Sequence, residues 1–423
     1  MFRGVILLFN QCFELAKIFF IISIVCFAPQ ILFREHKKPA PTLLGKSTNG
    51  AFKLGIENVT AEYISQICAG RAPRIGLITQ YGSHDKAENI VLLKSKGIEV
   101  AQIFYPTYDY FSNDIIDVGL KSLNSSIPSC VIKKDGFNDE LKDISLLLID
   151  LQNIGLGCVS SISLLFQGLS AAAKDKIPVV VLDRPNILGN KIEGSLLSNA
   201  GLNAQVPLRY GMTVAELAHY YNMHILHKEA QLHIVPMHNY DRLAVRQEID
   251  VNVLPKINNI TTAWGFSVCG ILAQVKPFDV GLDTDNPYRC IALPKSVIFP
   301  EQKWYQLQVV LRDVGIDSSI CRYYSKKKKE SCRGLRLYIE DMNTVDSFQL
   351  LLTTLEFFKR SGVILHFTDD FDQAVGSTLV RKYIQGKIPR HVLAQSVNQG
   401  LENFYRKAFG AFMYHPLPQV VLV

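Results

Sequence analysis

The sequence lacks the short motifs that several enzyme classes require for their chemistry. It contains no P-loop, no G-x-S-x-G nucleophile elbow and no H-E-x-x-H helix. It has nine cysteines, but no C-x-x-C pair and no Cys/His cluster with the spacing of metal ligands. Nor does it contain an internal repeat or a low-complexity segment. These absences argue against P-loop nucleotide chemistry, an α/β-hydrolase esterase, a bound metal and a redox dithiol.

The sequence has no long segment in which basic or acidic residues predominate. Lysines and arginines number 45 against 38 acidic residues, a formal net charge of +7, and the one tight basic run is Lys326 to Lys329. Because Tyr323, Tyr324 and Glu330 flank this run, it is typical of a solvated hairpin tip, and a specific polyanion site is the alternative. We therefore expect no nucleic-acid partner.

The cysteines leave one structural question open. Two of the nine lie in the first 35 residues, so seven scattered cysteines remain and at least one thiol is unpaired. Cys321 and Cys332 flank the lysine run and could staple a hairpin in an oxidising compartment. Free thiols at both positions are the favoured interpretation.

The first 35 residues differ from the rest of the chain. Their uninterrupted apolar part, Ile18 to Phe33, is shorter than the roughly 20 residues of a membrane span. We therefore predict a signal peptide or membrane anchor over residues 1–35 and a polar linker over 36–50. The protein is then expected in the cell envelope, either exported or attached to the membrane. A buried first helix of a cytosolic protein is the alternative.

The remaining chain is long enough for two folded domains. Apolar, β-rich runs end near Thr79, Asp150 and Leu182, and helical patterns lie between the runs. This alternation predicts βαβ units, and hence an α/β, Rossmann-like domain with a parallel sheet over residues 51–250. The pattern loosens afterwards, which predicts a smaller mixed α/β domain over residues 251–423.

Polar side chains follow three of these runs. Since the carboxyl ends of parallel strands meet at one edge of a sheet, groups suited to acid/base work or to a polar ligand are expected to converge there. Structural alternatives exist, because Asp183 would cap the next turn, Arg184 would pair with it and Asn186 would form an Asx-turn. The three stretches are Thr79-Gln80-Tyr81-Gly82, Asp150-Leu151-Gln152-Asn153 and Asp183-Arg184-Pro185-Asn186.

Two further patterns flank this predicted edge. Thr213 and Glu216 have the spacing of a capping box that opens an amphipathic helix. Gly155 and Gly157, with Ser160 in the place of a third glycine, form a partial dinucleotide fingerprint. A nucleotide-dependent Rossmann enzyme therefore stays open as an alternative.

Five segments, in their order and spacing, resemble the exo-β-N-acetylmuramidase family of bacteria, over about residues 70–415. The resemblance implies a Rossmann-like first domain, a smaller second domain, a substrate cleft between them and no cofactor. It also implies peptidoglycan fragments that end in N-acetylmuramic acid as the partner. The segments are RIGLIT, LLIDLQNIG, VLDRPNILGNKIEG, VPLRYGMTVAELAHYYN and IVPMHNYDR.

The chain departs from the family pattern where catalysis is expected. Thr107 stands in the place of the suspected catalytic glutamate of a Ser-Pro-Glu-His-Gly stretch, and Val280 replaces a second glutamate. Glycoside hydrolysis usually needs two carboxyl groups across the scissile bond. The surviving candidates for catalysis are Asp150, Asp183 and Glu193, with Asp109 and Asp283 as displaced substitutes.

Retained polar residues supply the predicted ligand contacts. Either Arg184 or Arg209 would hold the lactyl carboxylate of the muramic acid. Two functions stay open: a muramidase-like protein of peptidoglycan turnover with impaired or altered catalysis, and a catalytically inactive glycan-binding or scaffold protein. The predicted substrate-binding residues are Gln152, Asn153, Arg184, Asn186, Arg209 and Thr213.

Overall fold

A computed structural model describes the chain from residue 51 onward. The predicted leader and linker, and with them the replaced position Thr107 and the substitute Asp109, lie outside the described residues. In the part that is described, no helix is long and apolar enough to cross a membrane. The described ranges are 51–79, 85–106, 127–133, 136–198, 204–244, 256–257 and 259–423.

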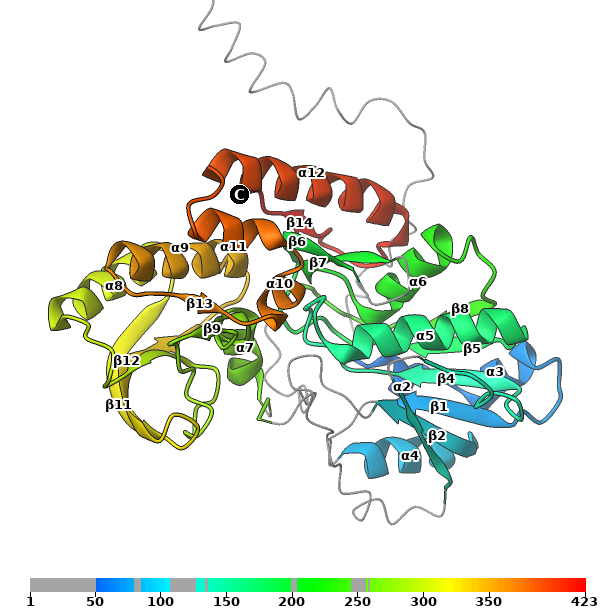
Figure 1. Cartoon of the computed structure of the whole chain (residues 1–423). Helices are drawn as coiled ribbons and strands as arrows, with labels where there is room; N and C mark the ends of the chain where they lie inside the picture. Colours follow the sequence, from blue (N-terminus) through cyan, green and yellow to red (C-terminus); the bar gives the residue numbers. More distant parts are fainter. Residues whose placement is uncertain are drawn as a thin grey trace, which may run out of the picture. The chain divides into compact units, whose positions relative to one another are not determined.

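A six-stranded parallel sheet organises the first half of the described chain (Figure 1). Its strand order is β3-β2-β1-β4-β5-β8, and every neighbouring pair is parallel. The predicted Rossmann-like parallel sheet is therefore confirmed. The strands are β1 (Ile75–Thr79), β2 (Val100–Pro106), β3 (Ser129–Ile132), β4 (Leu146–Asp150), β5 (Val179–Leu182) and β8 (Leu232–Val235).

Helices cover both faces of this sheet, which is why its strands are continuous apolar runs. Successive residues of β4 alternate between two hydrophobic clusters: Leu146 and Leu148 belong to one, Leu147 and Ile149 to the other. The first cluster includes side chains of the early helices, and the second includes α5 and α6. The helices are α2 (Gly55–Asn58), α3 (Ala61–Ile67), α4 (Asp85–Ser95), α5 (Ser160–Asp175) and α6 (Val214–His224).

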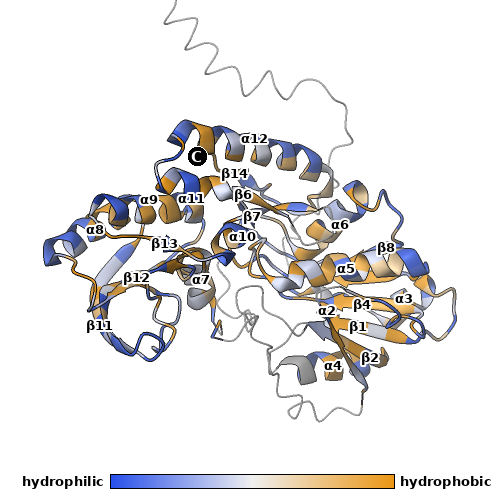
Figure 2. Ribbon diagram, viewed as in Figure 1, coloured by the Kyte–Doolittle hydropathy of each residue, from blue (hydrophilic) through white to orange (hydrophobic). Residues whose placement is uncertain are grey.

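A small second sheet follows β5 and was not predicted. β6 (Lys191–Ser198) and β7 (Gln205–Tyr210) pair antiparallel, and β14 (Gln419–Val420) joins β6 as a parallel neighbour. The long helix α12 (Arg390–Ala408) packs on β6 and β7, and Figure 2 shows hydrophilic and hydrophobic residues alternating along it. The carboxyl-terminal segment therefore completes a sheet that starts next to β5.

The second half contains mixed α/β structure around a three-stranded antiparallel sheet of order β10-β12-β11. Two short strands, β9 and β13, pair antiparallel with each other; β9 precedes the three-stranded sheet in the chain and β13 follows it. The predicted boundary between residues 250 and 251 stays a prediction. The elements are α7 (Ile260–Leu272), β9 (Val275–Lys276), β10 (Cys290–Pro294), α8 (Glu301–Asp313), β11 (Asp317–Ser325), β12 (Glu330–Tyr338), α9 (Ser347–Arg360), β13 (His366–Phe367), α10 (Asp370–Val375), α11 (Thr378–Ile384) and the 3₁₀ turn η2 (Phe409–Ala411).

The β11–β12 hairpin explains why its cysteines are free thiols. Cys321 lies opposite Gly334, whereas Cys332 lies opposite Tyr323. The two cysteines are therefore diagonal neighbours, whose Cα atoms are about 7 to 8 Å apart in such a pair. A disulfide needs a shorter Cα separation. The hairpin staple does not form in this structure.

The free thiols of the hairpin lead to a first prediction. We expect the same urea midpoint for unfolding with and without a reducing agent, because no cross-link joins Cys321 to Cys332. Loss of a staple would instead cost roughly 2 to 4 kcal/mol. Mass spectrometry of a non-reduced proteolytic digest is the control, and a peptide pair linked through these two cysteines would contradict the prediction.

Candidate active site

The strand order reverses between β1 and β4, and this is the point at which open α/β sheets hold their ligands. Thr79 and Asp150 end these two strands at their carboxyl edge, and the two residues are directly paired in register. Of the predicted polar strand ends, the stretch that begins at Asp150 therefore lies at the switch point itself.

Asp150 forms a buried, bidentate ion pair with Arg184. Nε of Arg184 donates to Oδ1 of Asp150 at 2.5 Å, and Nη2 donates to Oδ2 at 2.9 Å. Asn89 of α4 adds a bond from Nδ2 to Oδ2 at 3.2 Å. The predicted pairing of Arg184 with Asp183 is therefore wrong, because the arginine reaches across to the neighbouring strand. Such fork geometry orients an arginine well for planar anions.

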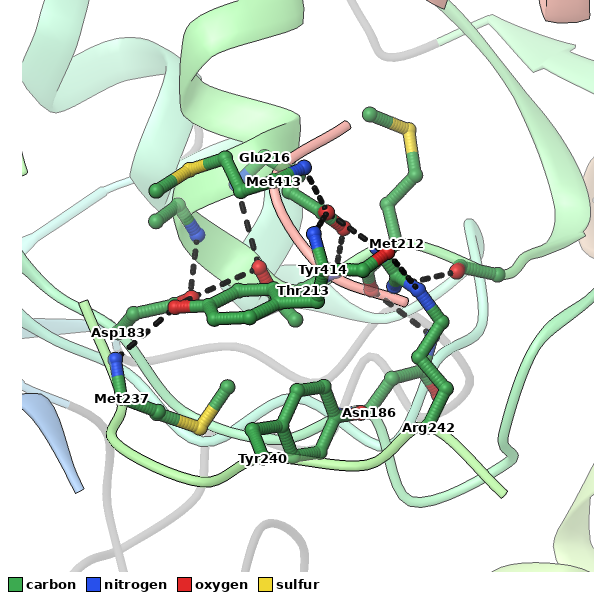
Figure 3. A network of polar contacts seen from close by, with 12 residues as sticks. Asp183, Asn186, Met212, Thr213, Glu216, Met237, Tyr240, Arg242, Met413 and Tyr414 are labelled. Atoms are coloured by element: carbon green, nitrogen blue, oxygen red, sulfur yellow. Dashed lines mark hydrogen bonds and ion pairs between the residues drawn. The ribbon is translucent and has the colours of Figure 1, made fainter. Parts of the chain in front are cut away.

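Asp183 faces the interior and is 0% exposed. Its Oδ1 accepts backbone N–H bonds from Arg184 at 2.9 Å and Ala215 at 3.0 Å, and its Oδ2 accepts from the hydroxyls of Thr213 at 2.9 Å and Tyr414 at 2.7 Å. Figure 3 shows Thr213 and Tyr414 beside the carboxylate. Asp183 therefore fixes the start of α6, and burial raises its pKa to about 7.

Glu216 extends this network toward the carboxyl-terminal segment. The predicted capping box is present, because Thr213 N–H donates to Glu216 Oε2 at 2.9 Å. Oε1 of the same glutamate accepts from Arg242, and from the backbone N–H groups of Met413 at 2.6 Å and Tyr414 at 3.3 Å (Figure 3). Arg242 ends the IVPMHNYDR segment of the family resemblance, whereas Tyr414 is a partner that no sequence pattern indicated, since it lies far from Glu216 in the chain.

Glu193 and Arg209 form a second buried ion pair, with 2.8 Å between Oε1 and Nη1. Glu193 also accepts the backbone N–H groups of Ser347 and Phe348, each at 3.0 Å, and so caps the start of α9. Arg209 donates to the carbonyl oxygens of Leu188, Val345 and Met342. Burial lowers the pKa of Arg209 although Glu193 opposes the effect.

This second ion pair does not present its charges to a ligand. Arg209 is 0% and Glu193 is 1% exposed. The predicted ligand contact of Arg209 therefore finds no open surface here, and the pair instead fastens the β6–β7 hairpin to the loop that precedes α9.

The remaining predicted contacts hold backbone segments together. Asn186 forms the expected Asx-turn by accepting Leu188 N–H at 2.9 Å, and it also donates to the Met212 carbonyl at 2.8 Å. Asn153 accepts Gly155 N–H at 2.9 Å. Gln152 donates to the carbonyls of Asn153 and Pro185.

One acceptor among these residues is left over. The Oε1 atom of Gln152 is buried and has no hydrogen-bond partner among the residues that the structure describes. Buried amide oxygens are nearly always satisfied, so this atom is a candidate acceptor for a ligand's hydrogen-bond donor.

The partial dinucleotide fingerprint has a structural explanation. Gly155 has φ of +107°, and a Cβ there would lie 2.2 Å from Oδ1 of Asn186. At Gly157 a Cβ would lie 2.6 Å from the Pro207 carbonyl oxygen. Both glycines make room for protein atoms, which removes the reason to expect a pyrophosphate at them.

Comparison with known proteins places this geometry in a family. The chain matches the models "Exo-beta-N-acetylmuramidase NamZ, N-terminal" over residues 75–263 and "Exo-beta-N-acetylmuramidase NamZ, C-terminal" over residues 268–414. The chain belongs to the NamZ exo-β-N-acetylmuramidase family. The predicted resemblance is thereby confirmed.

A curated relative supports the same assignment. Peptidoglycan beta-N-acetylmuramidase NamZ of Bacillus subtilis is 25% identical over 384 residues, which are 83% of this chain and 88% of the relative. Two crystal structures of DUF1343 family proteins from Bacteroides fragilis share the fold. They have TM-scores of 0.69 and 0.63, with 23% and 18% identity, and each comparison covers 86% of this chain and 99% of the other.

The family departures in the second half can be located in the structure. Val280 is buried, with 3% exposure, and offers no charge. Asp283, the displaced substitute, is exposed and its Oδ2 accepts the backbone N–H groups of Lys326 at 2.9 Å and Lys327 at 3.3 Å. Asp283 therefore holds the tip of the β11–β12 hairpin.

A small hollow with a cavity volume of about 20 Å³ lies next to the Asp183-to-Asn186 stretch. Asp341 lies on its wall and was missed by sequence reasoning, because no motif surrounds it. The Asp341 Oδ1 atom accepts both the backbone N–H and the side-chain amide of Asn343. The hollow is lined by Pro185, Asn186, Ile187, Gly189, Tyr240, Arg242, Ala244, Ile260, Trp264, Asp341, Met342 and Asn343.

The raised pKa of Asp183 predicts a pH dependence of stability. An unfolded aspartate loses its proton near pH 4, whereas Asp183 in the folded state keeps its proton up to about pH 7. Between these values the folded state binds more protons, so the contribution of Asp183 is greatest below about pH 4 and declines as the pH rises to 7.

Urea unfolding of the wild type and Asp183→Asn across pH 4 to 8 tests this dependence. The stability difference in favour of the wild type is expected to shrink with rising pH, by at most about 1.4 kcal/mol per pH unit. A difference that stays constant across the range contradicts the raised pKa.

A third prediction concerns the Glu193 and Arg209 pair. Glu193→Gln leaves a buried guanidinium without its counter-charge, so we expect a loss of about 3 to 5 kcal/mol in the free energy of unfolding. Asp317→Asn is the control, since its pair with Arg312 is exposed and spans 3.9 Å, and it is expected to change stability by less than about 1 kcal/mol. Equal effects of the two substitutions would show that the buried pair contributes little.

Proposed function

We propose that this protein recognises the terminal N-acetylmuramic acid of peptidoglycan fragments, and that its hydrolysis of the glycoside is impaired or altered. Membership of the NamZ family and the name of the Bacillus subtilis relative support the ligand class. The observation that carries the proposal is the Asp150 and Arg184 pair at the topological switch point.

Arg184 is suited to the lactyl carboxylate that distinguishes muramic acid from glucosamine. Its side chain is 10% exposed, in contrast to the fully buried Arg209, and Asp150 holds its guanidinium in one orientation. A carboxylate that approaches this guanidinium would form charge-assisted hydrogen bonds in a mostly buried setting. The unpartnered Oε1 of Gln152 would accept a hydrogen bond from a sugar hydroxyl or amide.

The same geometry supports impaired catalysis. A glycosidase usually places an acid and a carboxylate on either side of the scissile bond. Asp183 and Glu193 are enclosed by protein donors, and Val280 has no ionisable group. Asp150 is the predicted carboxylate that lies at the switch point, and its two oxygens are engaged by Arg184. One engaged carboxylate argues for slow or altered turnover.

A catalytically inactive glycan-binding protein is the second candidate. It shares the Arg184 contact with the first candidate but assigns no chemistry to Asp150. The observation that favours it is that every surviving carboxylate predicted as catalytic already accepts hydrogen bonds from the protein.

The purified full-length chain would be assayed for release of N-acetylmuramic acid from a chromogenic muramide, and for binding of the free sugar by calorimetry. We expect binding that prefers N-acetylmuramic acid to N-acetylglucosamine, and a loss of about tenfold or more in Arg184→Gln. Slow release that disappears in Asp150→Asn supports altered hydrolysis, whereas binding without release supports the inactive candidate. Absence of binding at millimolar sugar contradicts both.

An envelope location belongs to the same proposal, because peptidoglycan lies outside the cytoplasm. It rests on the apolar run within residues 1–35. The test is to fractionate cells and to measure the mass of the protein in each fraction. A cleaved signal peptide would shorten the chain, whereas an anchor would leave the full-length chain in the membrane fraction. Recovery of the full-length chain in the soluble cytoplasmic fraction contradicts it.

A further inference from the structure

Two arginines lie directly opposite each other on the β11–β12 hairpin. Arg322 on β11 is the register partner of Arg333 on β12. Like charges in this position destabilise a sheet. Arg333 forms an ion pair with Glu301 of α8, but Arg322 has no hydrogen-bond or ion-pair partner among the residues that the structure describes. The sheet therefore carries an uncompensated cation beside a second one.

Both arginines line a hollow in the protein surface. Its cavity volume is about 790 Å³, which is within the size range of ligand-binding sites. Tyr324 and Ile298 are 59% and 96% exposed at this site. Its lining residues are Leu293, Pro294, Lys295, Val297, Ile298, Phe299, Trp304, Arg322, Tyr323, Tyr324, Ser331, Cys332 and Arg333.

The wall of the hollow is held in place before any ligand arrives. Lys295 N–H donates to the Ser331 carbonyl at 2.8 Å. The Glu330 carboxylate accepts both the backbone N–H of Ser296 at 2.9 Å and its hydroxyl at 3.1 Å. Phe299 packs edge-on against Trp304, with 4.7 Å between the ring centroids. The Glu330 carboxylate is therefore engaged with the loop, and Arg322 stays without a counter-charge among the described residues.

This surface is distinct from the segment in which the family glutamate is replaced. Side chains alternate along β11, so that Tyr323 and Ser325 point away from the Arg322 face. Both donate to Asp279, at 2.7 Å each, on the opposite side of the sheet. A ligand that contacts the side chains of Arg322 and Tyr324 therefore lies on the other face of the sheet from Asp279, although part of Tyr323 also lines the hollow.

We propose that this hollow, lined by Lys295, Arg322, Tyr324 and Ile298, is a second binding site that holds a carboxylate-bearing peptidoglycan strand away from the candidate active site. Exposed arginine and lysine suit isolated carboxylates, and an exposed tyrosine with an apolar neighbour suits the faces of sugar rings. The inference rests on the proposed function, because an enzyme or receptor of terminal sugars needs a surface for the remainder of the polymer.

The test is co-sedimentation of the full-length protein with insoluble, purified peptidoglycan. We expect Arg322→Gln and Tyr324→Ala each to weaken binding by about fivefold or more. Peptidoglycan whose carboxylates have been amidated should bind the wild type as weakly as native peptidoglycan binds Arg322→Gln. Arg312→Gln, an exposed arginine of α8, removes the same charge elsewhere and is expected to bind like the wild type.

Free N-acetylmuramic acid separates this inference from the proposed function. Arg322→Gln should bind the free sugar as the wild type does, since the sugar occupies the other site. Failure of the wild type to bind the sugar, with polymer binding that still depends on Arg322, would remove the proposed function and keep the second site. Equal polymer binding by Arg322→Gln and the wild type, an equal loss in Arg312→Gln, or tighter binding to polyphosphate or anionic lipid vesicles would overturn the inference.

Discussion

A carboxylate enclosed by the protein ties three distant parts of the chain together. Asp183 directly follows β5, accepts the backbone N–H of Ala215 in the first turn of α6 and receives the hydroxyl of Tyr414. Through Thr213 it is linked to Glu216 and from there to Arg242. Because buried charged groups are tolerated only when they are paired and hydrogen-bonded, this network fixes the relative positions of its segments. The switch-point edge of the sheet is built on it.

Adjacent residues in one stretch serve opposite purposes. Asp183 points inward and stabilises the fold, while Arg184 turns back to Asp150 at the switch point. The buried structural residue and the residue that we propose to contact the ligand are therefore separated by a single position along the chain. A search for polar residues at strand ends finds both Asp183 and Arg184. It cannot tell which of them is buried, because burial depends on what packs over each strand.

The parallel sheet could be predicted from the sequence because burial on both faces leaves a local trace, the unbroken apolar run of β4 for example. β6 could not, since Lys191 and Glu193 interrupt its pattern although both are buried. Their partners, Asp346 and the amide of Ser347, come more than 150 positions later. Periodicity reports on neighbours in the chain, whereas these charges are neutralised by long-range contacts. For the same reason the partner of Arg184 was predicted wrongly.

The pairing of β14 with β6 bears on how this protein is made. Residues 413–420 supply the hydroxyl that binds Asp183, two amides for Glu216 and the strand beside Lys191 and Ile192. While synthesis proceeds from the amino terminus, the first half is complete long before these groups leave the ribosome. Its buried carboxylates then lack their last donors. The Rossmann-like half therefore gains the last of these hydrogen bonds only after translation has passed residue 420.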